Sequence, residues 1–245
     1  MKFALVTGAG SGIGRASAHA LMGAGWHVTL VGRRQDALAE TAQAAPGQAT
    51  ILPGDVGVPA EVDRIFAEHA ARHTRLDLLF NNAGRGAPAL PLDELPVEMF
   101  LDTVAVNLIG SVLCARAAFG LMRRQVPQGG RIINNGSLSA YVPRPHSVPY
   151  STTKHAITGL TRCLALDGRV YGIAAGQLDI GNAVTELTER MTDGVLQADG
   201  HMAPEPRMDV AQAGAAVLHM ANQPPGANVL FMTVMATDMP FVGRG

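Results

Sequence analysis

A tyrosine and a lysine stand four residues apart in the segment PYSTTKHAITGL. If this segment is helical, Tyr150 and Lys154 lie on the same helix face. A phenol loses its proton only near a pH of about 10, and a neighbouring ammonium group favours the phenolate. The pair is therefore suited to moving a proton to or from an alcohol or carbonyl oxygen. An ordinary surface pair is the alternative interpretation.

Two further polar residues have positions that suit the same chemistry. Ser137 lies thirteen residues before Tyr150, just beyond a predicted strand at 131–135. Because the carboxyl ends of parallel strands face the ligand crevice, its hydroxyl is expected to hydrogen-bond a substrate oxygen, with Ser139 as the alternative. Asn107 interrupts the apolar helical segment TVAVNLIGSVL, and its pattern alone indicates a core asparagine with satisfied hydrogen bonds.

A glycine-rich turn, TGAGSGIG at 7–14, joins the first predicted strand to the first predicted helix. Gly8, Gly12 and Gly14 would let a pyrophosphate approach the backbone amides and the helix N-terminus. The sequence Arg15-Ala16 follows where a nucleotide-hydrolase loop needs Lys and Ser or Thr. The turn therefore predicts a dinucleotide site, and a purely structural loop is the alternative.

The end of the second predicted strand indicates which dinucleotide is preferred. An acidic residue there would bind the ribose hydroxyls of NAD, but the strand ends in Val31-Gly32-Arg33-Arg34. A guanidinium group makes charge-assisted, forked contacts to phosphate. Arg33 therefore favours NADP(H), with NAD(H) still possible, while two solvated arginines at a helix start are the alternative.

Short β-rich runs alternate with longer helical patterns along the chain. The predicted strands are 3–7, 27–32, 49–54, 76–80, 131–135 and 171–178, and the later helices are 59–72, 98–125, 151–166 and 208–221. This alternation predicts an α/β protein: a single-domain Rossmann fold over 1–245, with a doubly wound parallel sheet and helices on both faces. The irregular segment around 184–207, with Leu187, Met191, Val195, Leu196 and Met202, is expected to be a lid over the substrate.

Composition excludes several other classes of protein. Among 245 residues, 47% are hydrophobic and 16% are charged, a balance that argues against disorder. The net charge of -1 offers no footprint for nucleic acid. Cys114 and Cys163 are expected to be small buried thiols, and no metal site is expected. The uncharged run 103–115 is shorter than the ~20 residues of a membrane span, and the first apolar run is too short for a signal peptide, which makes the cytoplasm the expected location.

The motifs together resemble one family. TGAGSGIG, Asp55-Val56, the NNAG at 81–84, Asn107, Ser137 and YSTTK occur in the order and spacing of the short-chain dehydrogenase/reductase family, over roughly three quarters of the chain. The resemblance implies that Tyr150 is the acid in reduction and the base in oxidation. It further implies that Lys154 also binds the nicotinamide ribose and that Asn107 holds a water in a proton relay ending at Lys154.

The resemblance also implies a set of cofactor-binding residues. In this interpretation Asp55 meets the adenine amino group and Val56 lies against its ring, although a helix-capping or turn role is the alternative for Asp55. The NNAG turn lies along the cofactor, and Thr185 contacts the carboxamide. The full set is Gly8, Ser11, Gly12, Ile13, Gly14, Arg33, Asp55, Val56, Asn82, Ala83, Gly84, Tyr150, Lys154, Gly181 and Thr185.

The chain departs from the family pattern at three places. After the sixth predicted strand, Gly176 and Ile180 stand where relatives usually carry asparagine and proline, which puts the rigidity of the turn near the nicotinamide in doubt. Ser11 occupies a position where many NADP-preferring relatives have Lys or Arg, so the phosphate would depend mainly on Arg33, with Arg34 and Arg15 as weaker candidates. The C-terminal VMATDMPFVGRG also differs from the usual ending.

The sequence thus predicts an NADP(H)-dependent oxidoreductase that interconverts a carbonyl and an alcohol. An NAD-dependent alcohol dehydrogenase and a non-catalytic NADP(H)-sensing protein are the alternatives, although a sensor has no need of Asn107, Ser137, Tyr150 and Lys154 together. The expected partners are a small-molecule substrate and copies of the chain, as a homodimer or homotetramer, with no nucleic acid and no membrane. The apolar lid suits a hydrophobic ketone, whereas Arg85, Arg144 and His146 leave room for a polar one.

Overall fold

The computed structural model describes residues 1–186, 188 and 194–242. In this part of the chain a seven-stranded sheet has the order β3-β2-β1-β4-β5-β6-β9, and all neighbouring strands pair in parallel. The strands are β1 Phe3–Thr7, β2 His27–Gly32, β3 Ala49–Pro53, β4 Leu78–Asn81, β5 Gly130–Asn135, β6 Ile173–Ile180 and β9 Phe231–Val234. The strand order reverses between β1 and β4, which is the switch point of a doubly wound Rossmann fold.

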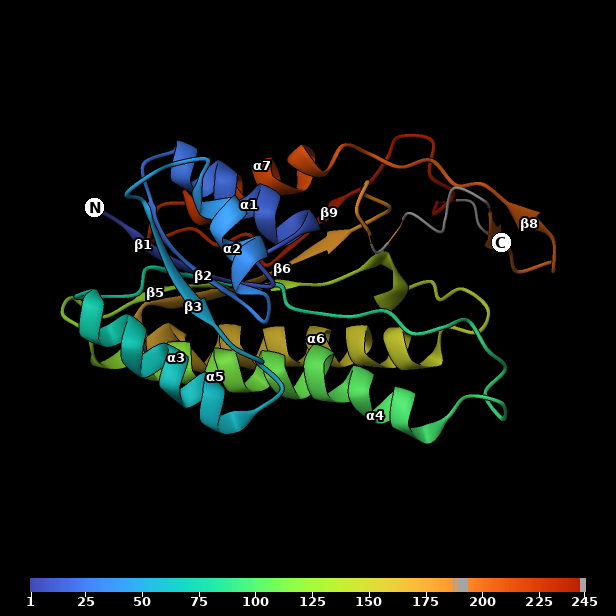
Figure 1. Cartoon of the computed structure of the whole chain (residues 1–245), viewed down its shortest axis with the longest axis horizontal. Helices are drawn as coiled ribbons and strands as arrows, with labels where there is room; N and C mark the ends of the chain where they lie inside the picture. Colours follow the sequence, from blue (N-terminus) through green and yellow to red (C-terminus); the bar gives the residue numbers. More distant parts are fainter. Residues whose placement is uncertain (187, 189–193, 243–245) are drawn as a thin grey trace.

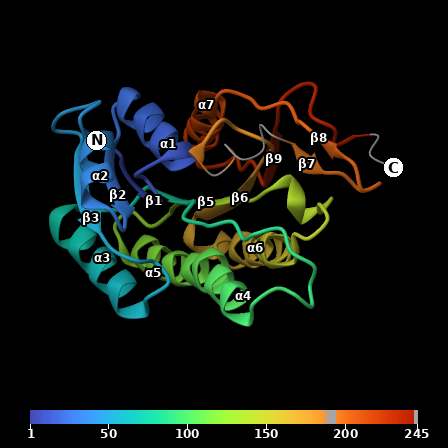
Figure 2. The ribbon, with the colours of Figure 1, turned by 45° about the vertical axis from the view of Figure 1, so that its right-hand side comes forward.

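Helices cover both faces of the sheet (Figure 1). One layer contains α1 Gly12–Gly23, α2 Gln35–Ala42 and α7 Val210–Ala221, and the other contains α3 Pro59–Arg72, α5 Ser111–Arg124 and α6 Val148–Asp167. Helix α4 Val97–Val104 continues through the π-helical turn η1 Ala105–Gly110 into α5 (Figure 2). The 3-10 turns η2 Leu138–Ala140 and η3 Arg169–Tyr171 follow β5 and α6, respectively.

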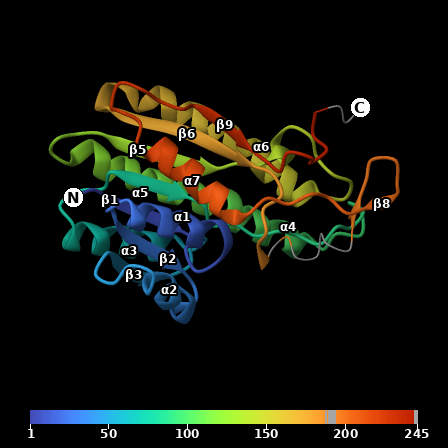
Figure 3. The same ribbon diagram turned by 90° about the horizontal axis from the view of Figure 1, so that it is seen from above.

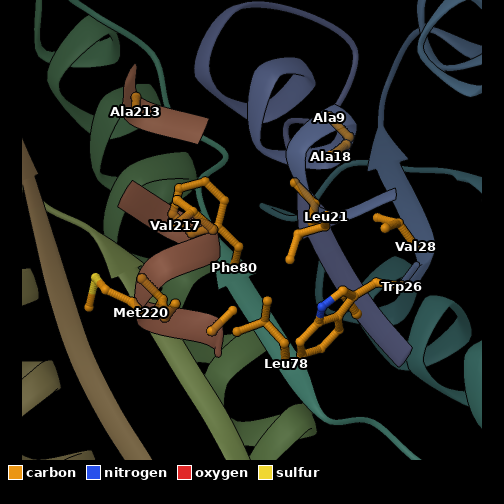
Figure 4. Packing of buried hydrophobic residues seen from close by; sticks show 14 of the residues in the cluster. Ala9, Ala18, Leu21, Trp26, Val28, Leu78, Phe80, Ala213, Val217 and Met220 are labelled. Carbon is orange, nitrogen blue, oxygen red and sulfur yellow. The ribbon is translucent and has the colours of Figure 1, made fainter. Parts of the chain in front are cut away.

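The core forms two layers because successive strand residues point to opposite sheet faces. In β4, Leu78 and Phe80 pack in one cluster and Leu79 in the other, and all three are fully buried. Figure 4 shows Phe80 lying among Leu21 of α1 and Val217 of α7. Strands buried on both faces explain the near-continuous apolar runs in the sequence.

The predicted fold class is confirmed, but several elements differ from the expectation. Strand β6 begins at Ile173 rather than residue 171, because η3 ends at Gly172 with a φ of 66°. The prediction missed α2, which at eight residues is too short for a clear helical period, and the four-residue edge strand β9. Cys114 is buried as expected, whereas Cys163 is exposed.

The expected lid segment is only partly described. The antiparallel hairpin of β7 Val195–Leu196 and β8 Met202–Ala203 lies in it, and Figure 3 shows β8 at the end of the molecule opposite the N-terminus. Residues 187 and 189–193, which include Leu187 and Met191, lie outside the described residues. A closing motion of this segment therefore stays a prediction.

The helix that contains Asn107 is longer than the uncharged apolar run 103–115. Val97–Arg124 is continuous over 28 residues, and by length and composition alone it could cross a membrane. Core helices of globular proteins pass the same test. Cys114, Ala118 and Met122 of α5 pack in the hydrophobic cluster between α5 and the sheet, which is the environment of a core helix.

Candidate active site

Three cavities form one continuous crevice at the carboxyl ends of the strands, because neighbouring cavities share lining residues. The nucleotide-end cavity, about 200 Å³, is lined by Arg33, Asp55 and Val56. The central cavity, about 590 Å³, is lined by the glycine turn, Lys154 and Thr185. The outer cavity, about 440 Å³, is lined by Ser137. Tyr150 lines both the central and the outer cavity and so stands at their junction.

The glycine turn has the shape that an anion requires. Gly8 and Gly12 have φ values of 67° and 48°, which favour glycine. A Cβ on Gly14 would lie 2.1 Å from the carbonyl oxygen of Gly8, so the turn folds directly onto itself. Ser11, the N-cap residue of α1, makes no side-chain hydrogen bond to the first turn. The backbone amides at this helix N-terminus are therefore available to hydrogen-bond a negatively charged group, and the residues fit a pyrophosphate.

The NNAG segment supports the glycine turn. The hydroxyl of Thr7, at the end of β1, accepts hydrogen bonds from the backbone amides of Asn82 and Ala83, both at 2.9 Å. Asn82 Nδ2 donates to the carbonyl of Thr7, also at 2.9 Å. A Cβ on Gly8 would lie 2.9 Å from this amide nitrogen, so the two loops are in close contact.

The nucleotide-end cavity distinguishes the candidate arginines. The guanidinium of Arg15 is engaged by Glu40 at 2.9 Å and by the carbonyl of Gly10, and Arg15 does not line the cavity. Arg34 lies 3.9 Å from the carboxylate of Glu186. Within the described residues Arg33 makes no ion pair, and it is exposed and lines the cavity. Arg34 and Arg85 also line this cavity, each near an acidic residue, so Arg33 is the arginine of the lining that has no ion pair among the described residues.

The position of Asp55 is compatible with both of its predicted roles, and its contact with adenine stays a prediction. Its Oδ1 accepts a hydrogen bond from the backbone amide of Gly57 at 2.8 Å, which stabilises the turn after β3. It also lines the nucleotide-end cavity beside Val56. A turn role and a ligand contact are therefore compatible in this side chain.

Helix α6 brings Tyr150 and Lys154 together as the four-residue spacing predicts. Pro149 lies in its first turn, where a proline costs no hydrogen bond. The Nζ of Lys154 donates to the carbonyl of Asn135 at 2.7 Å and lies 5.4 Å from the centroid of the Tyr150 ring. Lys154 is 5% exposed. Among the described residues no carboxylate forms an ion pair with it, and its ammonium group lies beside the Tyr150 ring.

Ser137 is held on two sides. Its backbone amide donates to Oδ1 of Asp179 at 3.0 Å. Its Oγ accepts a hydrogen bond from the backbone amide of Ser139 at 3.1 Å and thereby caps η2. The hydroxyl proton of Ser137 is left to donate into the outer cavity, which Tyr150 also lines. Ser139 also lines this cavity. Its backbone amide donates the hydrogen bond that orients the Ser137 hydroxyl.

Asn107 is fully hydrogen-bonded within the protein. Its Oδ1 accepts from the backbone amide of Arg85 at 2.8 Å, and its Nδ2 donates to the carbonyl of Arg85 at 2.9 Å and to Oγ1 of Thr153 at 3.3 Å. It is 2% exposed and lines none of the three cavities. The side chain ties the loop after β4 to the active-site helix, while the water relay stays a prediction.

The turn after β6 has no proline and is supported by β9 and the segment that follows it. The backbone amide of Gly181 donates to the carbonyl of Val234 in β9 at 2.8 Å. A Cβ on Gly181 would lie 2.7 Å from the Cβ of Met235, so the segment after β9 packs directly on this turn. Contact with β9 therefore supplies the support that Ile180 cannot give, and Ile180 and Thr185 line the central cavity.

Comparison with known proteins decides the family. The family model described as "short chain dehydrogenase" matches residues 2–195. The chain belongs to the short chain dehydrogenase family. It is 32% identical over 239 residues to L-fucose dehydrogenase of Oryctolagus cuniculus, covering 96% of this chain and 80% of that protein.

Solved structures of the family have the same fold. A 3-ketoacyl-(acyl-carrier-protein) reductase from Brucella melitensis, complexed with NADH, matches with a TM-score of 0.86 and 24% identity, over 97% of this chain and 98% of that one. The closed form of a serine dehydrogenase complexed with NADP+ matches with a TM-score of 0.86 and 23% identity, over 98% and 97%. As a short chain dehydrogenase, the protein is an NAD(P)-dependent oxidoreductase that acts on alcohol and carbonyl groups.

The structure adds features to this family member that the sequence analysis missed. Arg144, considered for a polar substrate, is paired with the buried carboxylate of Glu205, and its Nη2 donates to Asn182 Oδ1 at 3.0 Å. Burial acts to raise the pKa of Glu205, but the hydrogen bonds from Arg144 and Asn182 outweigh it and lower the pKa to about 2. The charge of Arg144 is therefore neutralised inside the outer cavity.

The C-terminal segment packs within its own chain. Met239, Pro240 and Phe241 line the outer cavity, and Ala236 and Met239 pack against Leu138 of η2. The last described residues of this short chain dehydrogenase therefore form one wall of the cavity that Ser137 and Tyr150 face.

Proposed function

We propose that this chain interconverts a carbonyl and an alcohol with NADP(H) and that Tyr150 is its general acid and base. The observation that carries the proposal is the position of Tyr150 at the junction of the central and outer cavities, beside the buried ammonium of Lys154. Membership of a family of alcohol and carbonyl oxidoreductases supports the reaction class.

Different residues of the crevice bind different parts of the cofactor. The amides of the glycine turn hold the pyrophosphate, and Arg33 holds the additional phosphate of NADP. Lys154 and Thr185 border the nicotinamide end of the central cavity. Bound NADP(H) supplies or accepts the hydride at the substrate carbon.

The side chains of the outer cavity move the proton. Ser137 Oγ donates a hydrogen bond to the substrate oxygen and holds it near Tyr150. In reduction, the Tyr150 hydroxyl gives its proton to that oxygen, and the phenolate that remains is stabilised by Lys154. In oxidation the phenolate removes the same proton. Burial of Lys154 strengthens this interaction, because charges attract more strongly away from water.

The outer cavity favours an uncharged, apolar substrate that contains a ring. Its described lining includes apolar side chains from three parts of the chain, namely η2 and the loop after it, the β7–β8 hairpin and the C-terminal segment: Leu138, Val142, Val195, Leu196, Met202, Met239 and Phe241. Glu205 neutralises Arg144, so this guanidinium is not available to an anionic substrate. A volume of about 440 Å³ accommodates one or two fused rings.

Cofactor oxidation measured against a panel of carbonyl compounds tests this function. Substituted cyclohexanones and decalones are expected to give the highest kcat/KM, above 2-oxo acids and open-chain sugars. A preference for an anionic or sugar substrate would contradict the proposed apolar substrate class but not the proposed reaction. Tight NADPH binding with no turnover of ketones, aldehydes, quinones or 3-oxoacyl thioesters would contradict the enzyme and favour a nucleotide sensor.

We further propose that the chain forms a homodimer or homotetramer. The outer faces of α4 to α6 carry exposed apolar side chains, namely Val97, Met99, Leu101, Ile109, Val112, Val148 and Leu166. Such a surface is typical of a contact between subunits. Light scattering coupled to gel filtration should give two or four times the mass of 25.6 kDa, and a monomer at micromolar concentration would contradict this part of the proposal.

A further inference from the structure

A buried carboxylate lies behind the proposed site. Asp179, in β6, is 0% exposed. Its Oδ1 accepts hydrogen bonds from the Ser137 amide at 3.0 Å and from Gln177 Nε2 at 2.7 Å, and its Oδ2 accepts from the Tyr141 hydroxyl at 2.8 Å. All three donors are neutral, and within the described residues no cation forms an ion pair with it. Burying a carboxylate without a cationic partner costs free energy, so Asp179 is a candidate for a functional role.

The backbone is shaped around this carboxylate. A Cβ on Gly136 would lie 2.0 Å from Oδ1 of Asp179, so any other residue at 136 would displace the carboxylate. Gly136 directly precedes Ser137, and its own amide donates to the carbonyl of Leu178 at 2.8 Å. The chain after β5 therefore passes close over Asp179 before it presents Ser137 to the outer cavity.

A row of buried amides orients Asp179. Asn81 of β4, Asn134 of β5 and Gln177 of β6 are in register across three neighbouring strands. Asn81 donates to Asn134 at 3.2 Å, and Thr161 of α6 accepts from Asn134 at 2.9 Å and donates to Gln177 at 3.2 Å. Gln177 then donates to Asp179. Because the side chain of each of these residues is hydrogen-bonded to the next, Gln177 holds the Asp179 carboxylate in one orientation.

Lys154 is held close to the backbone that covers Asp179, because its Nζ donates to the carbonyl of Asn135, the residue before Gly136. Burial raises the pKa of Asp179 above its ordinary value, and its three hydrogen bonds and the positive charge of Lys154 offset only part of this rise. In the described part of the chain, Lys154 lies beside Tyr150, and Tyr141 interacts in turn with Arg162. The neighbouring strand β9 carries no charged residue, and the one in β5, Arg131, is at the far end of that strand.

We propose that Asp179 is a positioning residue that holds Ser137 in place and, through its negative charge, offsets part of the effect of Lys154 on Tyr150. This inference rests on the proposed function of Tyr150. It predicts that removing the charge while keeping the hydrogen bonds leaves the phenolate of Tyr150 more stable.

Asp179→Asn separates the charge from the hydrogen bonds. The amide oxygen can still accept from Ser137 and Gln177, and its NH2 group can donate to Tyr141. In alcohol oxidation, where Tyr150 must be a phenolate, the rising limb of the pH–rate profile is expected to move to lower pH by roughly half a unit or more. Tyr141→Phe keeps the carboxylate charge and is the matched control, with its limb expected at the wild-type position.

A titration without substrate gives a second readout. The chain has only three tyrosines, so the phenolate absorbance of Tyr150 is obtained by subtracting the Tyr150→Phe titration in each background. Tyr150 is expected to ionise at a lower pH in Asp179→Asn than in the wild type. A midpoint that stays in place or rises, whether or not the rate falls, would overturn the proposal.

Two further results keep the tests distinct. If Asp179→Asn does not bind NADPH, the smaller uncharged variant Asp179→Ser replaces it under the same expectation. If the wild-type protein turns over no substrate, the proposed function fails, but the absorbance titration still decides the role of Asp179 because it needs no substrate.

Discussion

The two ends of the parallel sheet both bury ionisable side chains, but side chains of different kinds. At the carboxyl end, Asp179 and Lys154 are buried next to the crevice. At the amino end, the rings of His27, His69 and His73 pack against one another in tilted arrangements, with centroids 4.7 Å apart for His27 and His73 and 4.9 Å apart for His69 and His73. The ordinary pKa values of lysine and aspartate lie far from neutral pH, whereas histidine, with an ordinary pKa of about 6.5, readily loses its charge when it is buried.

The histidines are held as neutral groups. Burial, together with the nearby His73, lowers the pKa of His69 to about 4. Its ring nitrogens lie 2.9 Å from Thr29 Oγ1 and 3.3 Å from the carbonyl of Arg75, so both are satisfied without a charge. Burial also lowers the pKa values of His27 and His73. Among the described residues, no group of histidine, cysteine and acidic side chains is arranged to hold a metal ion.

We therefore expect the carboxyl end of the sheet to govern the reaction and the amino end to govern the pH dependence of stability. Variants at the carboxyl end are expected to change turnover or cofactor choice while the fold persists. Variants at the amino end are expected to change how stability depends on pH while turnover persists.

Tyr150→Phe should have the largest effect. It removes the proposed proton donor and acceptor and leaves the ring beside Lys154, so kcat is expected to fall by about 10²- to 10⁴-fold. NADPH affinity, measured by fluorescence titration, is expected to stay within about twofold. Tyr171→Phe is the control, because Tyr171 packs edge-on against Phe119 away from the crevice. Unchanged turnover in Tyr150→Phe would refute the role of the phenol.

Arg33→Asp should reverse the cofactor preference. It replaces the available cation of the nucleotide-end cavity with a carboxylate that repels the additional phosphate of NADP and accepts ribose hydroxyls. The ratio of kcat/KM for NADPH to that for NADH is expected to fall by about 100-fold, equivalent to about 2.7 kcal/mol. Arg34→Asp, next to it and already near Glu186, should cause a smaller change. A wild-type ratio in Arg33→Asp would contradict the phosphate assignment.

Local patterns predicted more of the site than long-range contacts did. The spacing of Tyr150 and Lys154 and the glycine turn could be interpreted because the interacting residues are close in sequence. Asp179 contacts Ser137 across 42 residues, and Arg144 contacts Glu205 across 61. Nothing in the sequence around either acid indicates its partner, because the pairing depends on the order of β5, β6 and the hairpin in space.

The smallest expected effect is on the pH dependence of stability at the amino end. The pKa of His69 is about 4 in the folded chain and about 6.5 in an unfolded one. Below pH 6.5 the unfolded state therefore binds the additional proton, and stability falls as the pH drops toward 4. His69 alone is expected to remove about 2 kcal/mol between pH 7 and pH 4.5.

His69→Gln should flatten this dependence, because an amide can hydrogen-bond both Thr29 and the carbonyl of Arg75 but does not take up a proton. Urea unfolding at several pH values measures the slope, and His155→Gln is the control because His155 is exposed on α6. Turnover at neutral pH should be unchanged in His69→Gln, since the cluster lies at the opposite ends of the strands from the crevice. A slope as steep as that of the wild type would show that acid acts elsewhere, and lost turnover would show that the two ends of the sheet are coupled.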